Sequence, residues 1–145
     1  MKWYLAVLKK YITLRGRARR KEFWIYTLID RLIQLIFMGI IVAFIISLTP
    51  PDTPTRNVNL DNISALGLMV SMVLFFIYLL ATILPTLAVT VRRLHDTDRS
   101  GWWVFISLVP YIGIFILLIL LGLEGTKGNN RFGTDPIPAE EYEKY

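Results

Sequence analysis

One histidine and two aspartates stand close together in the stretch RRLHDTDRSGWW, at residues 92–103. Imidazole and carboxylate groups can hold a divalent metal or transfer protons, so His95, Asp96 and Asp98 are candidates for either chemistry. A metal site normally draws ligands from several elements, and the chain has no second histidine and no cysteine to complete one. We therefore expect neither a metal, a cofactor nor a catalytic residue in this stretch.

The arginines of the same stretch offer simpler partners for these carboxylates. Ion pairs with Arg92, Arg93 or Arg99 would hold the aspartates, or an aspartate or Ser100 would cap the helix that follows. His95 would then be a hydrogen-bond donor at a membrane surface, near a tryptophan pair of the kind found at such interfaces. We interpret the stretch as a short, structural loop at that surface.

Long apolar runs must position these groups, because 54% of the residues are hydrophobic and the mean hydropathy is +0.52. This composition is too apolar for a typical small soluble domain. Three runs are long enough, as helices, to cross a hydrocarbon core about 30 Å thick. The sequence predicts an all-α membrane protein with three transmembrane helices, at about residues 23–49, 63–91 and 102–123.

The remaining segments complete a single integral membrane domain over residues 1–145. Residues 1–14 carry apolar side chains at helical spacing with lysines between them, which predicts a short amphipathic helix lying on the membrane surface. The cluster between Arg15 and Lys21 is typical of a positive flank that keeps an N-terminus in the cytoplasm. Three prolines between the first two spans predict a polar external loop at 50–62, and residues 124–145 form a polar tail.

Two polar stripes follow the first two spans toward the same end. Four polar residues recur at four-residue spacing in the first span, and three threonines around Pro85 repeat at the same spacing in the second. They are Glu22, Tyr26, Asp30 and Gln34, and Thr82, Thr86 and Thr90. Such stripes either tie helices together or line a functional path. We predict that Glu22 or Asp30 lies within salt-bridge reach of Arg92, Arg93 or His95.

Small residues predict where helices approach one another. Gly39, Ala43 and Ser47 form one small face on the first span, and Ser64, Gly67 and Ser71 form another on the second. Ser107, Pro110 and Gly113 predict a bend in the middle of the third span.

The distribution of Lys and Arg predicts the threading. Residues 1–22 and 92–99 together carry eleven, whereas residues 50–62 and the tail carry four. The positive-inside rule then places the N-terminus and the loop at 92–99 in the cytoplasm and the C-terminus outside. In the alternative, the third segment is re-entrant, folds back at Pro110 and Gly113, and keeps the tail inside.

Four motifs give the chain a resemblance to a known family. They are YITLRGRARRKEFW near the N-terminus, the central RRLHDTDRSGWW, VPYIG in the third span and GNNRFGTDP in the tail. Together they resemble the bacterial inner-membrane family catalogued as domain of unknown function 805, the YhaH and YhaI type. Asp98 departs from that pattern, in which glycine is the more usual residue. The resemblance implies a small multi-span protein of the cytoplasmic membrane and brings no activity with it.

Two functions remain open from the sequence. In the first, a non-enzymatic membrane protein binds anionic lipid headgroups, or an acidic segment of a membrane partner, through its cationic cytoplasmic face. In the second, the chain is a transporter or channel subunit that forms a homo-oligomer with a polar path along the first span. Nucleic acid is not an expected partner, because the cations lie at the ends of apolar spans.

The candidate interaction residues share a position at the expected cytoplasmic ends of the spans or in the tail. They are Arg17, Arg19, Arg20, Glu22, Asp30, Arg92, Arg93, His95, Asp96, Arg99, Ser100, Trp102, Trp103, Asn130 and Arg131.

Overall fold

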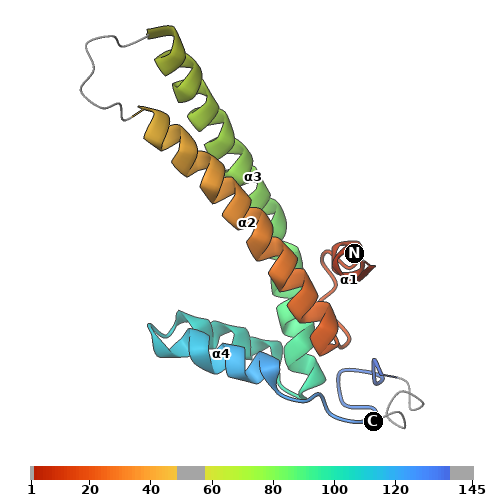
Figure 1. Ribbon diagram of the computed structural model, residues 1–145. Coiled ribbons are helices and arrows are strands. Elements are labelled where there is room, and N and C mark those ends of the chain that lie inside the picture. The colour runs from red at the N-terminus through yellow and green to blue at the C-terminus, as the bar shows by residue number, and fades with distance from the viewer. Residues whose placement is uncertain (1, 49–57, 138–145) are drawn as a thin grey trace. The chain divides into compact units, whose positions relative to one another are not determined.

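The computed structural model describes residues 2–48 and 58–137, and within these ranges the chain is helical and contains no strand. The elements are α1 (Lys2–Lys9), α2 (Arg20–Leu48), α3 (Val58–Asp96), the 3₁₀ helix η1 (Gly101–Leu108) and α4 (Ile112–Gly122), in the order that Figure 1 traces. Most of the predicted external loop and the last residues of the tail lie outside the described residues.

The chain divides into two compact units, which are described separately. Unit 1 comprises Met1–Thr27 and Ile83–Tyr145, and unit 2 comprises Leu28–Thr82. Unit 1 contains α1, η1, α4 and the tail, whereas unit 2 consists of the longer parts of α2 and α3.

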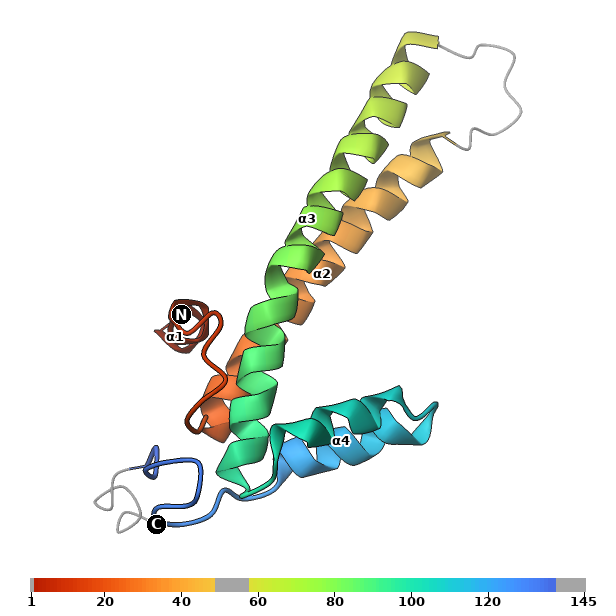
Figure 2. The same ribbon diagram turned by 180° about the vertical axis from the view of Figure 1, so that it is seen from behind.

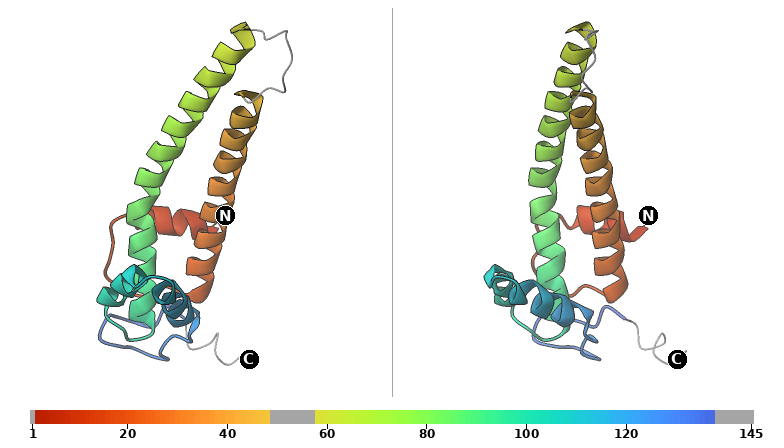
Figure 3. Two further views of the ribbon diagram at one scale, coloured as in Figure 1. Left: turned by 90° about the vertical axis from the view of Figure 1, so that its left-hand side faces the viewer. Right: turned by 60° about the vertical axis from the view of Figure 1, so that its left-hand side comes forward.

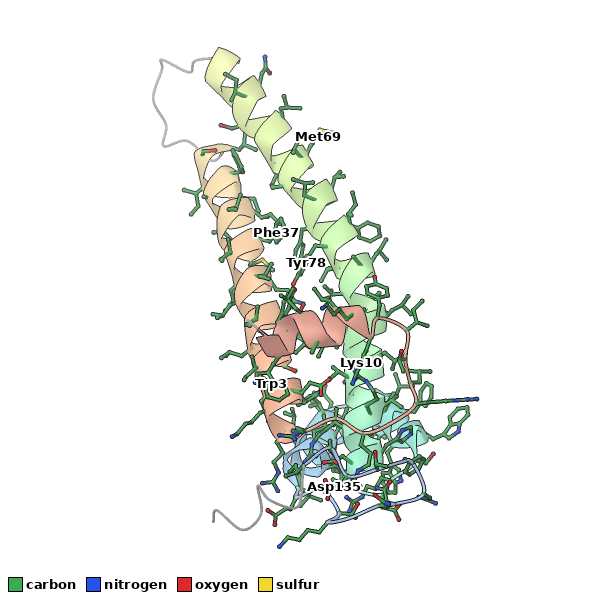
Figure 4. The ribbon with its side chains drawn as sticks, turned by 90° about the vertical axis from the view of Figure 1, so that its right-hand side faces the viewer. Trp3, Lys10, Phe37, Met69, Tyr78 and Asp135 are labelled. Carbon is green, nitrogen blue, oxygen red and sulfur yellow. The ribbon has the colours of Figure 1, made fainter. Side chains whose placement is uncertain are left out.

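In unit 2, α2 and α3 run side by side in both opposed views (Figures 1 and 2). The ring of Phe37 packs against those of Phe75 and Tyr78, with centroids 5.7 and 5.6 Å apart. Figure 4 shows Phe37 and Tyr78 facing one another between the helices. Gly67 permits a close approach, because a Cβ there would lie 2.4 Å from the ring of Phe44. Aromatic rings packed onto a small residue therefore hold this pair together.

Each of the first two spans was predicted to contact another helix through a face of small residues, and the structure confirms this for only one of them. Gly67 and Ser71 do lie on the contact side of α3, and Ser71 is buried. On α2 the prediction is wrong within this chain, since Gly39, Ala43 and Ser47 are exposed and nothing lies within 4 Å of a Cβ placed at Gly39. The bulky Phe44 of α2 fills the space above Gly67 instead, so one small face is sufficient for the contact.

Two helices, α2 and the Asn62–Asp96 part of α3, are long and apolar enough to cross a membrane. With 29 and 39 residues, α2 and α3 extend about 43 and 58 Å. Only 6% and 11% of the residues in their most apolar windows are buried. The described residues therefore leave most of the apolar surface of both helices uncovered.

The third predicted transmembrane helix is not confirmed. Residues 101–122 form two short helices, η1 and α4, that lie side by side in unit 1 (Figure 3). The chain reverses at Tyr111, which has a φ of +63°. Gly113 allows the reversal, because a Cβ there would lie 1.9 Å from the Ile106 carbonyl oxygen. The predicted bend is therefore a complete turn, and we call η1 and α4 the hairpin.

Other predicted boundaries also change. The interfacial helix is shorter than residues 1–14, because α1 ends at Lys9 and a turn follows, with a bond from the Lys10 N–H to the Val7 carbonyl. The predicted loop at 92–99 is helical as far as Asp96, and α3 continues through Pro85. Hydroxyl bonds from Thr82 to Tyr78 and from Thr90 to Thr86 add carbonyl contacts around this proline.

Unit 1 has its own apolar core, which joins α1, the start of α2, the end of α3 and α4. Its buried members are Val7, Ala18, Phe23, Tyr26, Val89, Leu94, Leu117 and Leu121. The rings of Tyr4 and Tyr26 stack with centroids 5.4 Å apart, which fixes α1 to α2. This core brings the basic N-terminal segment and the end of α3 together.

Candidate functional site

A buried ion pair joins the first turn of α2 to the end of α3. Arg92 donates through Nη1 to Oε1 of Glu22 at 3.0 Å, and both side chains are almost fully buried. This confirms the predicted pairing for Glu22. Arg92 also donates to the Ala88 carbonyl at 3.3 Å, while its Nη2 has no partner in the part of the chain that the structure describes.

The two predicted polar stripes also meet in unit 1, at a second level away from the Glu22–Arg92 pair. The hydroxyls of Tyr26 and Thr86 are 3.0 Å apart and share a hydrogen bond. The main chain reinforces this junction, because the Ala18 N–H donates to the Arg92 carbonyl at 3.1 Å. These stripes therefore tie helices together at this level.

Asp96 is the centre of a second buried ionic group. Its Oδ1 accepts from Nε of Arg17 at 2.9 Å, and its Oδ2 accepts from Nη1 of Arg93. All three side chains are buried. One carboxylate thus binds two guanidinium groups, one from its own helix and one from the segment before α2.

The tail approaches Asp96 so closely that only glycine fits. A Cβ at Gly125 would lie 2.1 Å from Oδ2 of Asp96. Beside it, the Thr126 N–H donates to the Asp96 carbonyl at 2.8 Å. The glycine in this part of the tail is therefore a packing requirement of the ionic group.

Guanidinium groups bind the backbone of the tail and of the end of α4. Arg93 Nε donates to the Leu121 carbonyl at 2.9 Å, Arg20 Nε to the Leu123 carbonyl at 3.0 Å, and Arg17 Nη1 to the Gly128 carbonyl at 2.5 Å. These contacts place the tail around Gly128 beside the segment around Arg17. The predicted threading with an external tail is therefore not confirmed, and the contacts fit the re-entrant alternative.

His95 also contacts the tail, next to the contacts made by Arg17 and Arg93. Its ring stacks on Phe132, with centroids 3.9 Å apart and planes at 2°, and its Nδ1 lies 3.3 Å from the Gly16 carbonyl, to which it donates. Asn130 donates to the His95 carbonyl at 2.8 Å. The role of His95 as a hydrogen-bond donor is therefore confirmed, with the backbone of the basic segment as the acceptor.

The turn after α3 explains an unusual residue. Asp98 has a φ of +57°, in the left-handed region that favours glycine, which accounts for the glycine expected there in the family. Its carboxylate forms an ion pair of 3.2 Å with Arg131, and both side chains are largely exposed. Ser100 then caps η1, and its side chain accepts from the Trp102 N–H at 3.5 Å.

Three groups of candidate residues lie apart from the ionic cluster. Asp30 belongs to unit 2, where it accepts from the Tyr78 hydroxyl at 2.8 Å and from the Gln34 amide at 2.9 Å, so of the two carboxylates offered for the predicted salt bridge only Glu22 forms it. Trp102 and Trp103 are exposed on η1. Arg99 contributes a backbone bond to the Leu94 carbonyl at 3.0 Å.

A cavity of about 540 Å³ opens beside Arg17 and Asp96 in unit 1. Five of its lining side chains are cationic, namely Arg17, Arg19, Arg20, Lys21 and Lys127. The candidate list omitted Lys21, Gly125 and Lys127. The only sequence signal for the tail residues was their place in the glycine-rich stretch GTKGNNRFGTDP, which does not reveal the segment it contacts.

A family model described as Protein of unknown function (DUF805) matches residues 11–134. The inner membrane protein YhaI of Escherichia coli strain K12 is 43% identical over 136 residues, covering 94% of this chain and 96% of YhaI. The inner membrane protein YhaH of the same strain is 40% identical, covering 94% and 97%. No solved structure matches this chain.

Proposed function

Since the chain belongs to the family described as Protein of unknown function (DUF805), we propose that it is a non-enzymatic protein of the bacterial inner membrane that binds anionic lipid headgroups. In this proposal α2 and α3 cross the bilayer, and the cationic unit 1 lies at the cytoplasmic surface. The names of the relatives YhaI and YhaH support a location in the inner membrane. The positive charge of unit 1 supports binding to anionic headgroups.

The observation that carries the proposal is the folding of the tail onto Arg17 and Asp96. It adds two tail cations, Lys127 and Arg131, to the eleven of residues 1–22 and 92–99, so in this proposal thirteen of the sixteen Lys and Arg residues lie on the cytoplasmic side. Each cation near an anionic surface contributes about 1 kcal/mol of attraction. A cytoplasmic face with this charge favours anionic lipids over zwitterionic ones.

The hairpin fits the same threading. At about 2.0 and 1.5 Å per residue, the eight residues of η1 and the eleven of α4 each extend about 16 Å, roughly half of a hydrocarbon core. Apolar side chains are exposed on both helices, including Leu108, Phe115 and Ile119. The hairpin enters one leaflet and returns, which keeps both termini in the cytoplasm.

Cysteine labelling tests the threading, because the chain contains no cysteine of its own. A membrane-impermeant maleimide should react with Lys127→Cys in inverted vesicles and leave it unlabelled in intact spheroplasts. Thr53→Cys, in the loop expected outside, should show the reverse pattern. Labelling of Lys127→Cys in intact spheroplasts would overturn the proposed threading.

Lipid preference tests the function itself. The full chain is reconstituted in nanodiscs with equal amounts of phosphatidylglycerol and phosphatidylcholine, and the lipids that remain bound are identified by native mass spectrometry. We expect enrichment of phosphatidylglycerol that decreases at high salt. Equal retention of the two lipids would refute headgroup binding, and co-purification of an acidic protein segment in place of lipid would assign the face to a protein partner.

A second candidate is an oligomeric transporter or channel subunit, which one observation in unit 2 favours. Asp30 is 2% exposed within a largely apolar helix pair, and ionisable groups buried in this way often serve transport. In proteoliposomes, Asp30→Asn should then alter ion flux without changing the melting temperature. A folding defect with unchanged flux would instead assign Asp30 to helix packing.

A further inference from the structure

The cationic cavity of unit 1 is lined by the basic run at residues 17–21, by Asp96 at the end of α3 and by the tail. Arg17 and Arg19 precede α2, Arg20 and Lys21 lie in its first turn, and Lys127 comes from the tail. Figure 4 labels Asp135 among the tail residues at this end of unit 1. The tertiary structure therefore adds Lys127 of the tail to the basic cluster of the N-terminal segment.

Three carboxylates also line the cavity, but two of them are already engaged. Asp96 accepts from Arg17 and Arg93. Asp135 accepts from the backbone N–H groups of Gly128 at 2.7 Å and Ile137 at 2.9 Å. With Asp96 balancing Arg17, the other cations outnumber Glu124 and Asp135, and the cavity keeps an excess of positive charge.

The start of α2 strengthens the attraction for an anion. Arg20 and Lys21 occupy its first turn, where the helix dipole and the unpaired backbone N–H groups favour negative charge. Glu22 stands in the same turn, but its carboxylate is taken by Arg92. The positive end of the helix therefore adds to the charge of the exposed side chains of Arg20 and Lys21.

Size and the position of Glu124 narrow the class of ligand. A cavity of about 540 Å³ lies within the usual range for small-molecule sites, roughly 300–1,000 Å³, and has more room than one phosphate group needs. Glu124 is exposed at its wall. Its carboxylate repels a doubly charged phosphomonoester, whereas it accepts hydrogen bonds from hydroxyl groups.

We infer that this cavity is a binding site for the phosphodiester headgroup of a glycerol-bearing phospholipid. The inference deepens the proposed function and rests on it. The phosphate group binds Arg20 and Lys21, and the hydroxyls of the headgroup glycerol donate to Glu124. Specific recognition by this one cavity is thereby added to the general attraction of the cationic face.

Binding of short-chain phosphatidylglycerol to the detergent-solubilised full chain tests the site. Arg20→Gln and Lys21→Gln should each weaken binding about fivefold. Lys10→Gln is the matched control, because Lys10 is exposed beyond α1 and does not line the cavity (Figure 4). An equal loss in all three variants, or no loss in the first two, would overturn the site, while retained selectivity of the wild-type chain in nanodiscs would leave the proposed function standing.

Two further measurements fix the ligand. Glu124→Gln should reduce the preference for short-chain phosphatidylglycerol over short-chain phosphatidic acid, and an unchanged preference would overturn the assigned orientation. Inorganic phosphate and glycerophosphoglycerol serve as free competitors. Displacement of the lipid by glycerophosphoglycerol alone supports the headgroup assignment, whereas equal displacement by inorganic phosphate at the same concentration would show a simple anion site and refute it.

Discussion

Units 1 and 2 both bury carboxylates in a largely apolar chain, but they provide different partners for them. In unit 1, Glu22 and Asp96 bind the guanidinium groups of Arg92, Arg93 and Arg17. In unit 2, Asp30 binds the neutral Tyr78 hydroxyl and Gln34 amide. Removal of a partner therefore leaves an unpaired buried charge in unit 1, whereas in unit 2 it removes one hydrogen bond.

The largest effect is expected from Asp96→Ala. This change strands two buried cations, Arg17 and Arg93, and also removes the group against which Gly125 packs. Breaking a buried pair typically costs about 3–5 kcal/mol. The free energy of unfolding, measured by denaturant titration in a mild detergent, should fall by at least that amount. A change below about 1 kcal/mol would mean that the ionic group is solvated and does not hold the tail.

Gly125→Ala should have the second-largest effect, a loss of about 1–3 kcal/mol in the free energy of unfolding, which is typical of overpacking. The added Cβ would meet Oδ2 of Asp96 and force the tail away from α3. Protease sensitivity after Lys127 should increase accordingly, in addition to the loss of stability. Gly122→Ala is the matched control, since nothing lies within 4 Å of a Cβ there. Equal protease sensitivity of both variants would argue against the close contact.

Tyr78→Phe probes the neutral partner in unit 2 and should cost about 1 kcal/mol, because hydrogen bonds between membrane helices are individually modest. It removes the hydroxyl that donates to Asp30 and keeps the ring that packs on Phe37. The same denaturant titration measures this loss in the free energy of unfolding. Phe75→Tyr, which adds a hydroxyl to the other ring packed on Phe37, is the control for altered polarity. A loss of stability as large as that of Asp96→Ala would contradict the difference between the ionic partners of unit 1 and the neutral partners of unit 2.

Arg131→Gln should have the smallest effect, below about 1 kcal/mol. Its ion pair with Asp98 is exposed, with 61% and 46% of the two side chains accessible, so water and salt screen it. Raising the salt concentration should abolish the remaining difference from the wild-type chain. A salt-insensitive loss would indicate that the stack of Phe132 on His95 depends on Arg131, which lies over the Phe132 ring at 4.8 Å.

Helical periodicity was sufficient to predict the two long helices and a salt bridge from Glu22 or Asp30 to Arg92, Arg93 or His95, of which the structure forms Glu22 with Arg92. Residues four apart lie on one helix face, so the stripes through Tyr26 and Thr86 had to meet wherever α2 and α3 pack together. The same reasoning could not choose between Glu22 and Asp30. Periodicity places Asp30 on that face, but does not reveal that Tyr78, an aromatic residue expected only to pack, supplies its hydrogen bond.

The third span and the tail show a different limit of sequence reasoning. Hydropathy cannot distinguish one crossing of the membrane from a hairpin, because both bury the same apolar residues, and only the reversal at Tyr111 separates them. Counting cations likewise could not reveal that the tail hydrogen-bonds to Arg17.

By itself, the sequence determined the helical class, the two long apolar helices and the family, since these follow from composition, periodicity and local motifs. Only the tertiary structure decided that the tail folds onto Asp96 and that the cations of α2 and the tail share one cavity. The physical reason is that such contacts join residues more than seventy positions apart, and their partners are selected by packing and charge in three dimensions rather than by spacing along the chain.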